Sequence, residues 1–115
     1  DVYKRQPLSN IVDAFRFAIS SHIHESGLDT DRAAELCGMS KRTLARKLSN
    51  RGTTCYQEIC RLRRQRAEQQ LTETKLSIGR IAASVGYSDP VVFSRAFKRW
   101  TGKSPREFRA SQNTT

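Results

Sequence analysis

The 115-residue sequence has few of the residues that cross-link, break or bend a chain: three cysteines, three prolines and six glycines. The cysteines are odd in number and show no CxxC spacing, which argues against a disulfide framework, so we expect a reducing, cytoplasmic setting. No apolar run is long enough to span a bilayer and no signal-peptide pattern is present, so no membrane partner is expected. GxSxG, Walker and dinucleotide-binding loops are also missing, so we expect neither an enzyme nor a cofactor.

The sequence also lacks period-two alternation of useful length, which argues against strands. Apolar residues instead recur every three to four positions, and the pattern predicts an all-α fold of about seven helices. Thr30, Ser40, Ser77 and Asp89 are the predicted N-caps of four of them. The expected helices cover about residues 8–26, 31–37, 41–50, 54–73, 78–85 and 90–100, with a last short helix opened by the capping box at 104–107.

Acidic residues are scarce in two segments. Residues 41–66 hold nine basic residues and only Glu58, and residues 95–109 hold six basic residues and only Glu107. The formal net charge is +10, yet residues 1–40 and 67–94 are slightly acidic. Because Lys and Arg gain affinity by displacing counterions from phosphates, this segregation indicates a polyanion partner. A basic surface that only aids solubility is the alternative.

The chain contains an internal repeat that coincides with this charge pattern. Residues 31–48 read DRAAELCGMSKRTLARKL, and residues 79–97 read GRIAASVGYSDPVVFSRAF. Ala34 pairs with Ala82 and Gly38 with Gly86, and after one inserted residue Arg46 pairs with Arg95. Each copy predicts a short helix, a turn with glycine and a second helix, which is the pattern of a DNA-binding helix-turn-helix.

The spacing of apolar residues in the second helix of each copy predicts one buried face and one solvent-exposed face. Leu44 and Leu48 in the first copy, and Phe93 and Phe97 in the second, are expected to point inward. The outward residues are the candidates for contacting bases in double-stranded DNA: Lys41, Arg42, Ala45 and Arg46, then Pro90, Val91, Ser94 and Arg95. Arginine can donate two hydrogen bonds to guanine, and an exposed valine suits a thymine methyl. The alternative is that Val91 and Val92 pack on a neighbouring helix.

Helix N-termini and the flanking cations predict phosphate contacts. The candidates are Ser40, Thr43, Lys47, Ser77, Ser88, Lys98, Arg99 and Lys103. Arg63 is also expected to contribute to the binding of all sequences alike. The predicted long helix would separate the two copies by roughly 30 Å, close to the roughly 34 Å of one DNA turn, so both could enter successive major grooves.

The sequence resembles the DNA-binding domain of the AraC/XylS family over about residues 8–109. The similarity is carried by IGRIAASVGYSDPVVFSRAFKRWTGKSPREFR at 78–109, SKRTLARKLSNRGTT at 40–54 and LRRQRAEQQL at 62–71. The resemblance implies two helix-turn-helix subdomains joined by a long helix, promoter binding and recruitment of RNA polymerase. It also implies base contacts by Arg42, Ala45, Arg46, Pro90, Val91 and Arg95.

The expected organisation is a tail or linker stub at 1–7, a first subdomain at 8–52, a connecting helix at 53–75, a second subdomain at 76–111 and a tail at 112–115. Family members usually carry a further domain for effector binding or dimerisation, which is absent from this chain, so we expect a C-terminal fragment. Cys55 and Glu58 stand where the family often has apolar residues. Ala45 and Pro90 have no side chain that can hydrogen-bond to a base. An alternative role for the second helix-turn-helix unit is therefore to hold the DNA backbone without reading bases.

Other interpretations remain open from sequence. A nucleic-acid or protein interaction module that binds mainly by charge is the alternative function. His22 and His24 form an HxH pattern, but they point to different sides of a helix and no further ligands complete a set, so no metal site is expected. Cys37 is expected to be a small buried residue. Cys55 and Cys60 are expected to be inert packing, with redox sensitivity beside arginines as the alternative.

Overall fold

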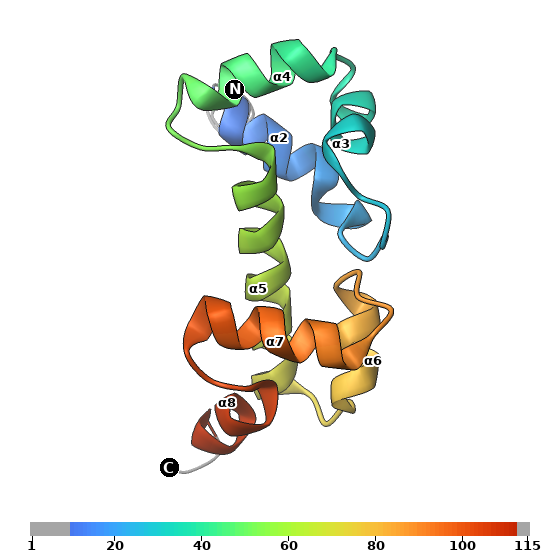
Figure 1. Ribbon diagram of the computed structural model, residues 1–115, viewed down its shortest axis with the longest axis vertical. Helices are drawn as coiled ribbons and strands as arrows, with labels where there is room; N and C mark the ends of the chain where they lie inside the picture. The colour runs from blue at the N-terminus through green and yellow to red at the C-terminus, as the bar shows by residue number, and fades with distance from the viewer. Residues whose placement is uncertain (1–9, 113–115) are drawn as a thin grey trace, which may run out of the picture. The chain divides into compact units, whose positions relative to one another are not determined.

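The computed structural model describes residues 10–112, which form seven α-helices and one short 3₁₀ helix (Figure 1). The helices are α2 (Ile11–Ile19), α3 (Thr30–Cys37), α4 (Lys41–Ser49), α5 (Cys55–Glu73), α6 (Ile78–Ser84), α7 (Pro90–Thr101) and α8 (Pro105–Gln112), with η2 (Ser20–His22) after α2. None of the described residues forms a strand. The predicted all-α fold with about seven helices is therefore confirmed.

The chain divides into two compact units, and the division falls inside α5. Of the described residues, unit 1 comprises 10–23 and 27–62, and unit 2 comprises 24–26 and 63–112. Figure 1 shows α5 as one unbroken helix that contributes its first half to unit 1 and its second half to unit 2. The subdomain limits expected from sequence, 8–52, 53–75 and 76–111, stay a prediction.

The core of unit 1 is aliphatic apart from one ring. Phe15 and Ile19 of α2, Leu44 and Leu48 of α4, and Ile59 of α5 are all buried in one cluster. These residues recur at helical spacing, so each helix turns one apolar face to the others. The inward orientation that the sequence predicts for Leu44 and Leu48 is confirmed.

Unit 2 has an aromatic core built from α7. Phe93 and Phe97 are fully buried, as predicted, and pack with Ala67 and Leu71 of α5 and with Ile81 of α6. Polar contacts also join these helices. Arg64 of α5 donates to the Trp100 carbonyl at 2.9 Å, and Arg109 of α8 donates to the Leu71 carbonyl at 3.1 Å. The Arg109 contact satisfies a carbonyl in the last turn of α5, which has no partner within the helix.

Two predicted boundaries are wrong. The N-cap of α3 is Asp29, not Thr30, because Asp29 has extended backbone and its carboxylate accepts the Arg32 N–H at 2.9 Å. The first helix ends at Ile19 and not near residue 26. Beyond it the chain tightens into η2, and the Ser20 hydroxyl donates to the Phe17 carbonyl at 3.2 Å. Serine favours such local bonds over helix continuation. Residues 8 and 9, where that helix was expected to start, lie outside the described residues.

Unit 1 also contains a buried carboxylate, Glu58, which is only 1% exposed. Its Oε1 accepts from Arg16 Nε at 2.7 Å, and its Oε2 accepts from the Thr53 hydroxyl at 2.6 Å and from Arg61 Nη1 at 3.2 Å. Burial alone would raise the pKa of Glu58. The hydrogen bonds from Thr53 and Arg16 and the charges of Arg16 and Arg61 outweigh it, and the pKa is lowered.

This lowered pKa predicts acid sensitivity in unit 1. A carboxyl whose pKa is lower in the folded state stabilises the fold above its unfolded pKa, and that contribution is lost as pH falls through the folded pKa. We expect the unfolding free energy to fall more between pH 7 and pH 3 in the wild type than in Glu58→Gln, which cannot titrate. Hydrogen exchange at the Leu48 amide measures unit 1 specifically. Equal acid loss in both proteins would contradict the prediction.

Candidate nucleic-acid interface

In unit 1, α3 and α4 form a helix-turn-helix. Gly38 adopts φ +68°, and its N–H donates to the Glu35 carbonyl while the Met39 N–H donates to the Ala34 carbonyl, both at 3.1 Å. This pair of bonds is a Schellman motif, which needs a left-handed residue and therefore favours glycine. The motif ends α3, and α4 begins three residues later, after Ser40.

Unit 2 repeats this turn between α6 and α7. Gly86 has φ +90°, its N–H donates to the Ala83 carbonyl at 3.1 Å, and the Tyr87 N–H donates to the Ala82 carbonyl at 2.9 Å. Ala82 and Gly86 are the residues that the repeat pairs with Ala34 and Gly38. The internal repeat in the sequence is thus a repeat of one turn geometry.

Helix α4 presents its predicted base-contacting residues to solvent. Lys41, Arg42, Ala45 and Arg46 are all exposed, while Leu44 and Leu48 on the opposite face are fully buried. Lys41 Nζ lies 3.3 Å from Asp31 Oδ1 of α3, an exposed ion pair. Such a pair contributes at most about 1 kcal/mol, so it can open when a phosphate approaches.

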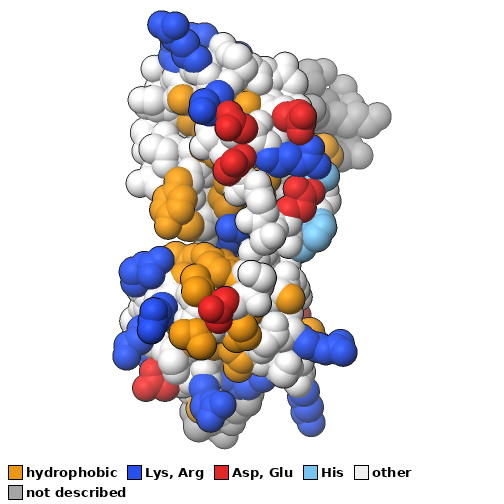
Figure 2. Space-filling view, turned by 45° about the vertical axis from the view of Figure 1, so that its right-hand side comes forward, with side chains coloured by type: hydrophobic (Ala, Val, Ile, Leu, Met, Phe, Trp, Pro, Cys, Tyr) orange, Lys and Arg blue, Asp and Glu red, His pale blue; other side chains and the backbone are white. Residues whose placement is uncertain are grey.

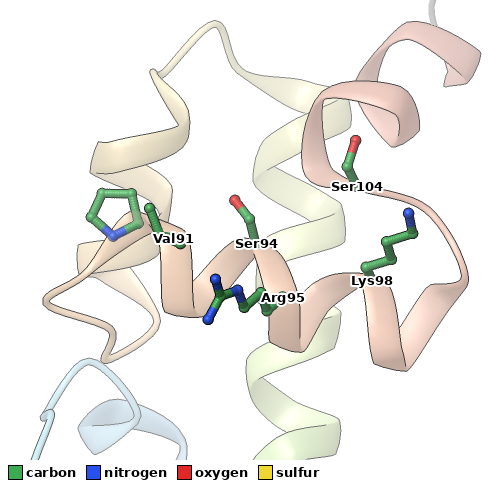
Figure 3. A pocket seen from close by; sticks show the side chains of 6 residues that line it. Val91, Ser94, Arg95, Lys98 and Ser104 are labelled. Carbon is green, nitrogen blue, oxygen red and sulfur yellow. The ribbon is translucent and has the colours of Figure 1, made fainter.

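Helix α7 forms one side of an open groove of about 340 Å³ in unit 2. Five predicted contact residues line it, and Ser104 at the start of α8 completes it: Pro90, Val91, Ser94, Arg95, Lys98 and Ser104 (Figure 3). Figure 3 shows Val91, Ser94, Arg95 and Lys98 spaced along α7, with Arg95 between Val91 and Lys98, and Ser104 on the segment that leads into α8. Val91 and Arg95 are four residues apart, which places them on the same helix face.

The exposed apolar surface of unit 2 includes this helix. Val91 is 57% exposed and Val92 is 48% exposed, so the alternative in which both valines pack against a neighbouring helix is wrong. Figure 2 shows hydrophobic side chains gathered on one face of the part of the chain that carries α6 and α7, with Lys and Arg side chains around them. An exposed valine can contact the methyl group of a thymine, and an arginine beside it can donate hydrogen bonds to acceptors on the base edges.

The predicted phosphate contacts fall into two groups. Lys47, Ser88, Lys98, Arg99 and Lys103 are exposed, and Thr43 is half-buried. Ser40 and Ser77 act as N-caps, and their hydroxyls accept the Thr43 N–H at 3.1 Å and the Arg80 N–H at 3.2 Å. At α7, Pro90 has no N–H and Val91 donates to Asp89 Oδ1 at 2.8 Å. The start of α7 therefore offers fewer donors to a phosphate than expected.

Arg63, which the sequence suggests as a contributor to the binding of all sequences alike, is partly buried by contacts within unit 2. It is half-buried in unit 2, where Nη2 donates to the Glu25 carbonyl at 2.9 Å and the guanidinium lies 5.5 Å from the centroid of the Tyr87 ring. The side chain is thus engaged within the fold, and the contribution of Arg63 to DNA binding stays a prediction. Replacing Arg63 removes internal contacts, so this residue is unsuitable as a test of phosphate binding.

Sequence reasoning missed Ser104 as a groove residue and assigned it only a capping role. The capping box is confirmed: the Ser104 hydroxyl accepts the Glu107 N–H at 3.1 Å, and Glu107 Oε1 accepts the Ser104 N–H at 2.9 Å. The backbone and side-chain hydrogen bonds with Ser104 lower the pKa of Glu107. Because Gly102 turns the chain back at φ +85°, α8 starts beside the end of α7, a placement that no local pattern shows.

The residues that line the α7 groove include no cysteine or histidine. Cys55 is buried in unit 1, and burial raises the pKa of its thiol; the redox alternative required nearby arginines to lower it. Cys37 is half-buried against the same core, rather than fully buried. Within residues 10–112, no three His, Cys, Asp or Glu side chains gather where they could hold a metal ion. No helix in that part of the chain has the length and hydropathy to cross a membrane.

Comparison with known proteins identifies the class to which these two units belong. Residues 33–111 match the family model described as a helix-turn-helix domain. The ornithine utilization regulator of Pseudomonas aeruginosa is 42% identical over 81 residues, which are 70% of this chain and 24% of that protein. The chain thus spans about a quarter of the length of that curated relative.

Solved structures that superpose on this chain belong to the same class of protein. A transcriptional regulator from Chromobacterium violaceum, described as AraC-type, superposes with a TM-score of 0.77 at 30% identity, covering 99% of this chain and 98% of that one. The DNA-binding domain of AdpA, a global transcriptional factor solved with a target DNA, gives a TM-score of 0.76 at 27% identity, covering 89% and 92%. The chain belongs to the AraC-type helix-turn-helix family of DNA-binding domains found in transcription regulators.

Proposed function

We propose that this domain is the sequence-reading part of a transcription regulator, and that α4 and α7 enter successive major grooves of one promoter. The observation that carries the proposal is the exposed arginine on each second helix: Arg46 on α4 and Arg95 on α7. Both stand at equivalent places of the repeat, on faces opposite buried core residues. The complex of the related AdpA domain with its target DNA supports the assignment.

The residues that we assign to DNA contact divide by chemistry into two roles. Arg42, Arg46 and Arg95 donate to guanine acceptors, and Val91 contacts a thymine methyl. The remaining side chains that we assign to bases are Lys41, Ala45, Pro90 and Ser94. Phosphates are held by Lys47, Lys98, Arg99 and Lys103, with Ser40, Thr43, Ser77 and Ser88 supplying neutral donors. Ala45 and Pro90 give only van der Waals contact, so each helix reads few base pairs.

The partners of the whole regulator follow from the same assignment. We propose that the protein acts in the cytoplasm, where the promoter that it binds is located. We also propose that the DNA-bound protein recruits RNA polymerase. The relatives' names as regulators support this part of the proposal. An interaction module that binds by charge alone is the competing function, and it differs in one measurable way: it has no preference among sequences.

Replacing Arg46 tests this difference. We expect Arg46→Ala to lose about 1–3 kcal/mol of discrimination at one base pair of the preferred site, because a bidentate contact to guanine is removed. Lys47→Ala is the matched control, since it removes a neighbouring exposed cation of α4 that we assign to phosphate. It should weaken cognate and random duplexes by the same factor, measured by fluorescence anisotropy at fixed salt. Equal losses on both duplexes for both variants would favour the charge-only module.

A further inference from the structure

The loop after α4 is tied to both the recognition helix and the core of unit 1. Gly52 takes φ +75°, and its N–H donates to the Ser49 carbonyl at 2.9 Å. The next residue, Thr53, donates its N–H to the Leu48 carbonyl at 3.1 Å and its hydroxyl to Glu58 Oε2 at 2.6 Å. One residue thus joins the last turn of α4 to α5.

Glu58 extends this tie to a third helix. Its other oxygen accepts from Arg16 of α2 at 2.7 Å, so a continuous path runs from the Leu48 carbonyl through Thr53 and Glu58 to Arg16. Glu58 is 1% exposed, whereas Arg16 and Arg61 keep 36% and 52% of their side-chain surface. The carboxylate is therefore the fixed centre of the path.

Stability alone is a weak reason for a carboxylate at this position. Taking a charge out of water is costly, and well-packed apolar residues of similar volume often stabilise a core as well as a buried ion pair does. An apolar residue, however, has no directional bond to offer Thr53. The distinctive contribution of the carboxylate is the fixed direction of its hydrogen bonds.

We infer that Glu58 is a positioning residue for DNA reading: through Thr53 it holds the C-terminal end of α4 at the angle at which Arg46 meets its base pair. The inference rests on the proposed function of α4. Arg46 lies in the same last turns of α4 as Leu48, the residue whose carbonyl Thr53 holds. A bidentate contact tolerates displacements of only about 0.5 Å, so a loosened helix end lowers discrimination before it lowers overall attraction to DNA.

Two substitutions at Thr53 test the inference. Thr53→Val keeps the shape and the N–H bond to Leu48 but removes the hydroxyl, whereas Thr53→Ser keeps the hydroxyl. We expect Thr53→Val to weaken the cognate duplex about fivefold to tenfold, the effect of one hydrogen bond, and to leave random DNA nearly unchanged. The lost discrimination should fall on the bases contacted by α4, not on those contacted by α7, and Thr53→Ser should bind like the wild type.

Two comparisons separate positioning from a general loss of stability. Ile19→Val trims the core of unit 1 without touching the path, and at temperatures where all variants are folded it should leave discrimination unchanged. Because Thr53→Val removes the donor and Glu58→Met removes the acceptor of the same bond, the double variant should lose no more discrimination than the larger single loss. If Ile19→Val, matched for melting temperature, loses as much discrimination as Thr53→Val, the inference is overturned.

Arg46→Ala distinguishes failure of the inference from failure of the proposed function. Should Arg46→Ala lose discrimination while Thr53→Val keeps it, α4 reads bases without this tie, and only the inference fails. If Arg46→Ala leaves base preference intact, α4 does not read that base pair, and both fail. Loss in both variants, with Thr53→Ser unaffected, is the result that we expect.

Discussion

Phe97→Ala should destabilise unit 2 by about 3–5 kcal/mol, the typical cost of removing a buried aromatic side chain and leaving a cavity. Phe97 is fully buried, and its ring centroid lies 5.8 Å from that of Phe93, 6.4 Å from Trp100 and 5.3 Å from Phe108. These rings come from α7 and α8. The cavity would therefore loosen the attachment of α8 and the inner face of the recognition helix together.

A single tryptophan reports the unfolding of unit 2, and an exposed phenylalanine provides the control substitution. Trp100 is the sole tryptophan and belongs to unit 2, so its fluorescence during urea unfolding monitors that unit. Phe17→Ala makes the same chemical change at a side chain that is 74% exposed, and surface changes of this kind usually stay within about 0.5 kcal/mol. A Phe97→Ala protein that unfolds at the wild-type urea concentration would contradict the assigned faces of α7.

The second large effect is on salt dependence. A domain that makes about six to ten phosphate contacts loses roughly 10³–10⁵ in affinity between 50 and 200 mM salt, because each neutralised phosphate releases condensed counterions. Four exposed cations of residues 41–47 and 95–103 are assigned to phosphate, namely Lys47, Lys98, Arg99 and Lys103, so the expected loss over the same salt range is roughly 10²-fold. We expect a steep linear fall of log affinity with log salt, and Lys98→Ala should reduce the slope by about one.

Lys75 serves as the control for this measurement. It is exposed, but it lies between α5 and α6 and outside the proposed contact set, so Lys75→Ala should leave the slope unchanged. Binding that is almost independent of salt would contradict the assignment of the basic segments to phosphate. A slope that falls equally for Lys75→Ala and Lys98→Ala would mean that charge acts without a defined interface.

Local chemistry explains which parts of the fold were predictable. Gly38 and Gly86 adopt positive φ, and the Asp89-Pro90 pair starts α7; each of these signals lies within a few residues of the structure that it determines. The inward faces of α4 and α7 follow from helical spacing alone. Asp29 and Thr30 are both good caps, and only the backbone angles of the folded chain decide between them.

Contacts between distant residues explain the rest. Arg16 meets Glu58 across 42 positions, and Arg63 meets the Glu25 carbonyl across 38, so neither pairing has a signature in local sequence. Exposure on a helical wheel identified the residues of the α7 groove, but the place of Ser104 in it depends on how α8 folds back. Charge patterns thus predicted the partner better than they predicted the roles of individual arginines.

Both recognition helices are expected to read bases, and selection of duplexes from a random pool at near-physiological salt measures this for the two helices at once. We expect an enriched site with two blocks about one helical turn apart. Arg46→Ala should then erase preference in one block and Arg95→Ala in the other. Failure to enrich any sequence, with binding that collapses as salt rises, would contradict this expectation.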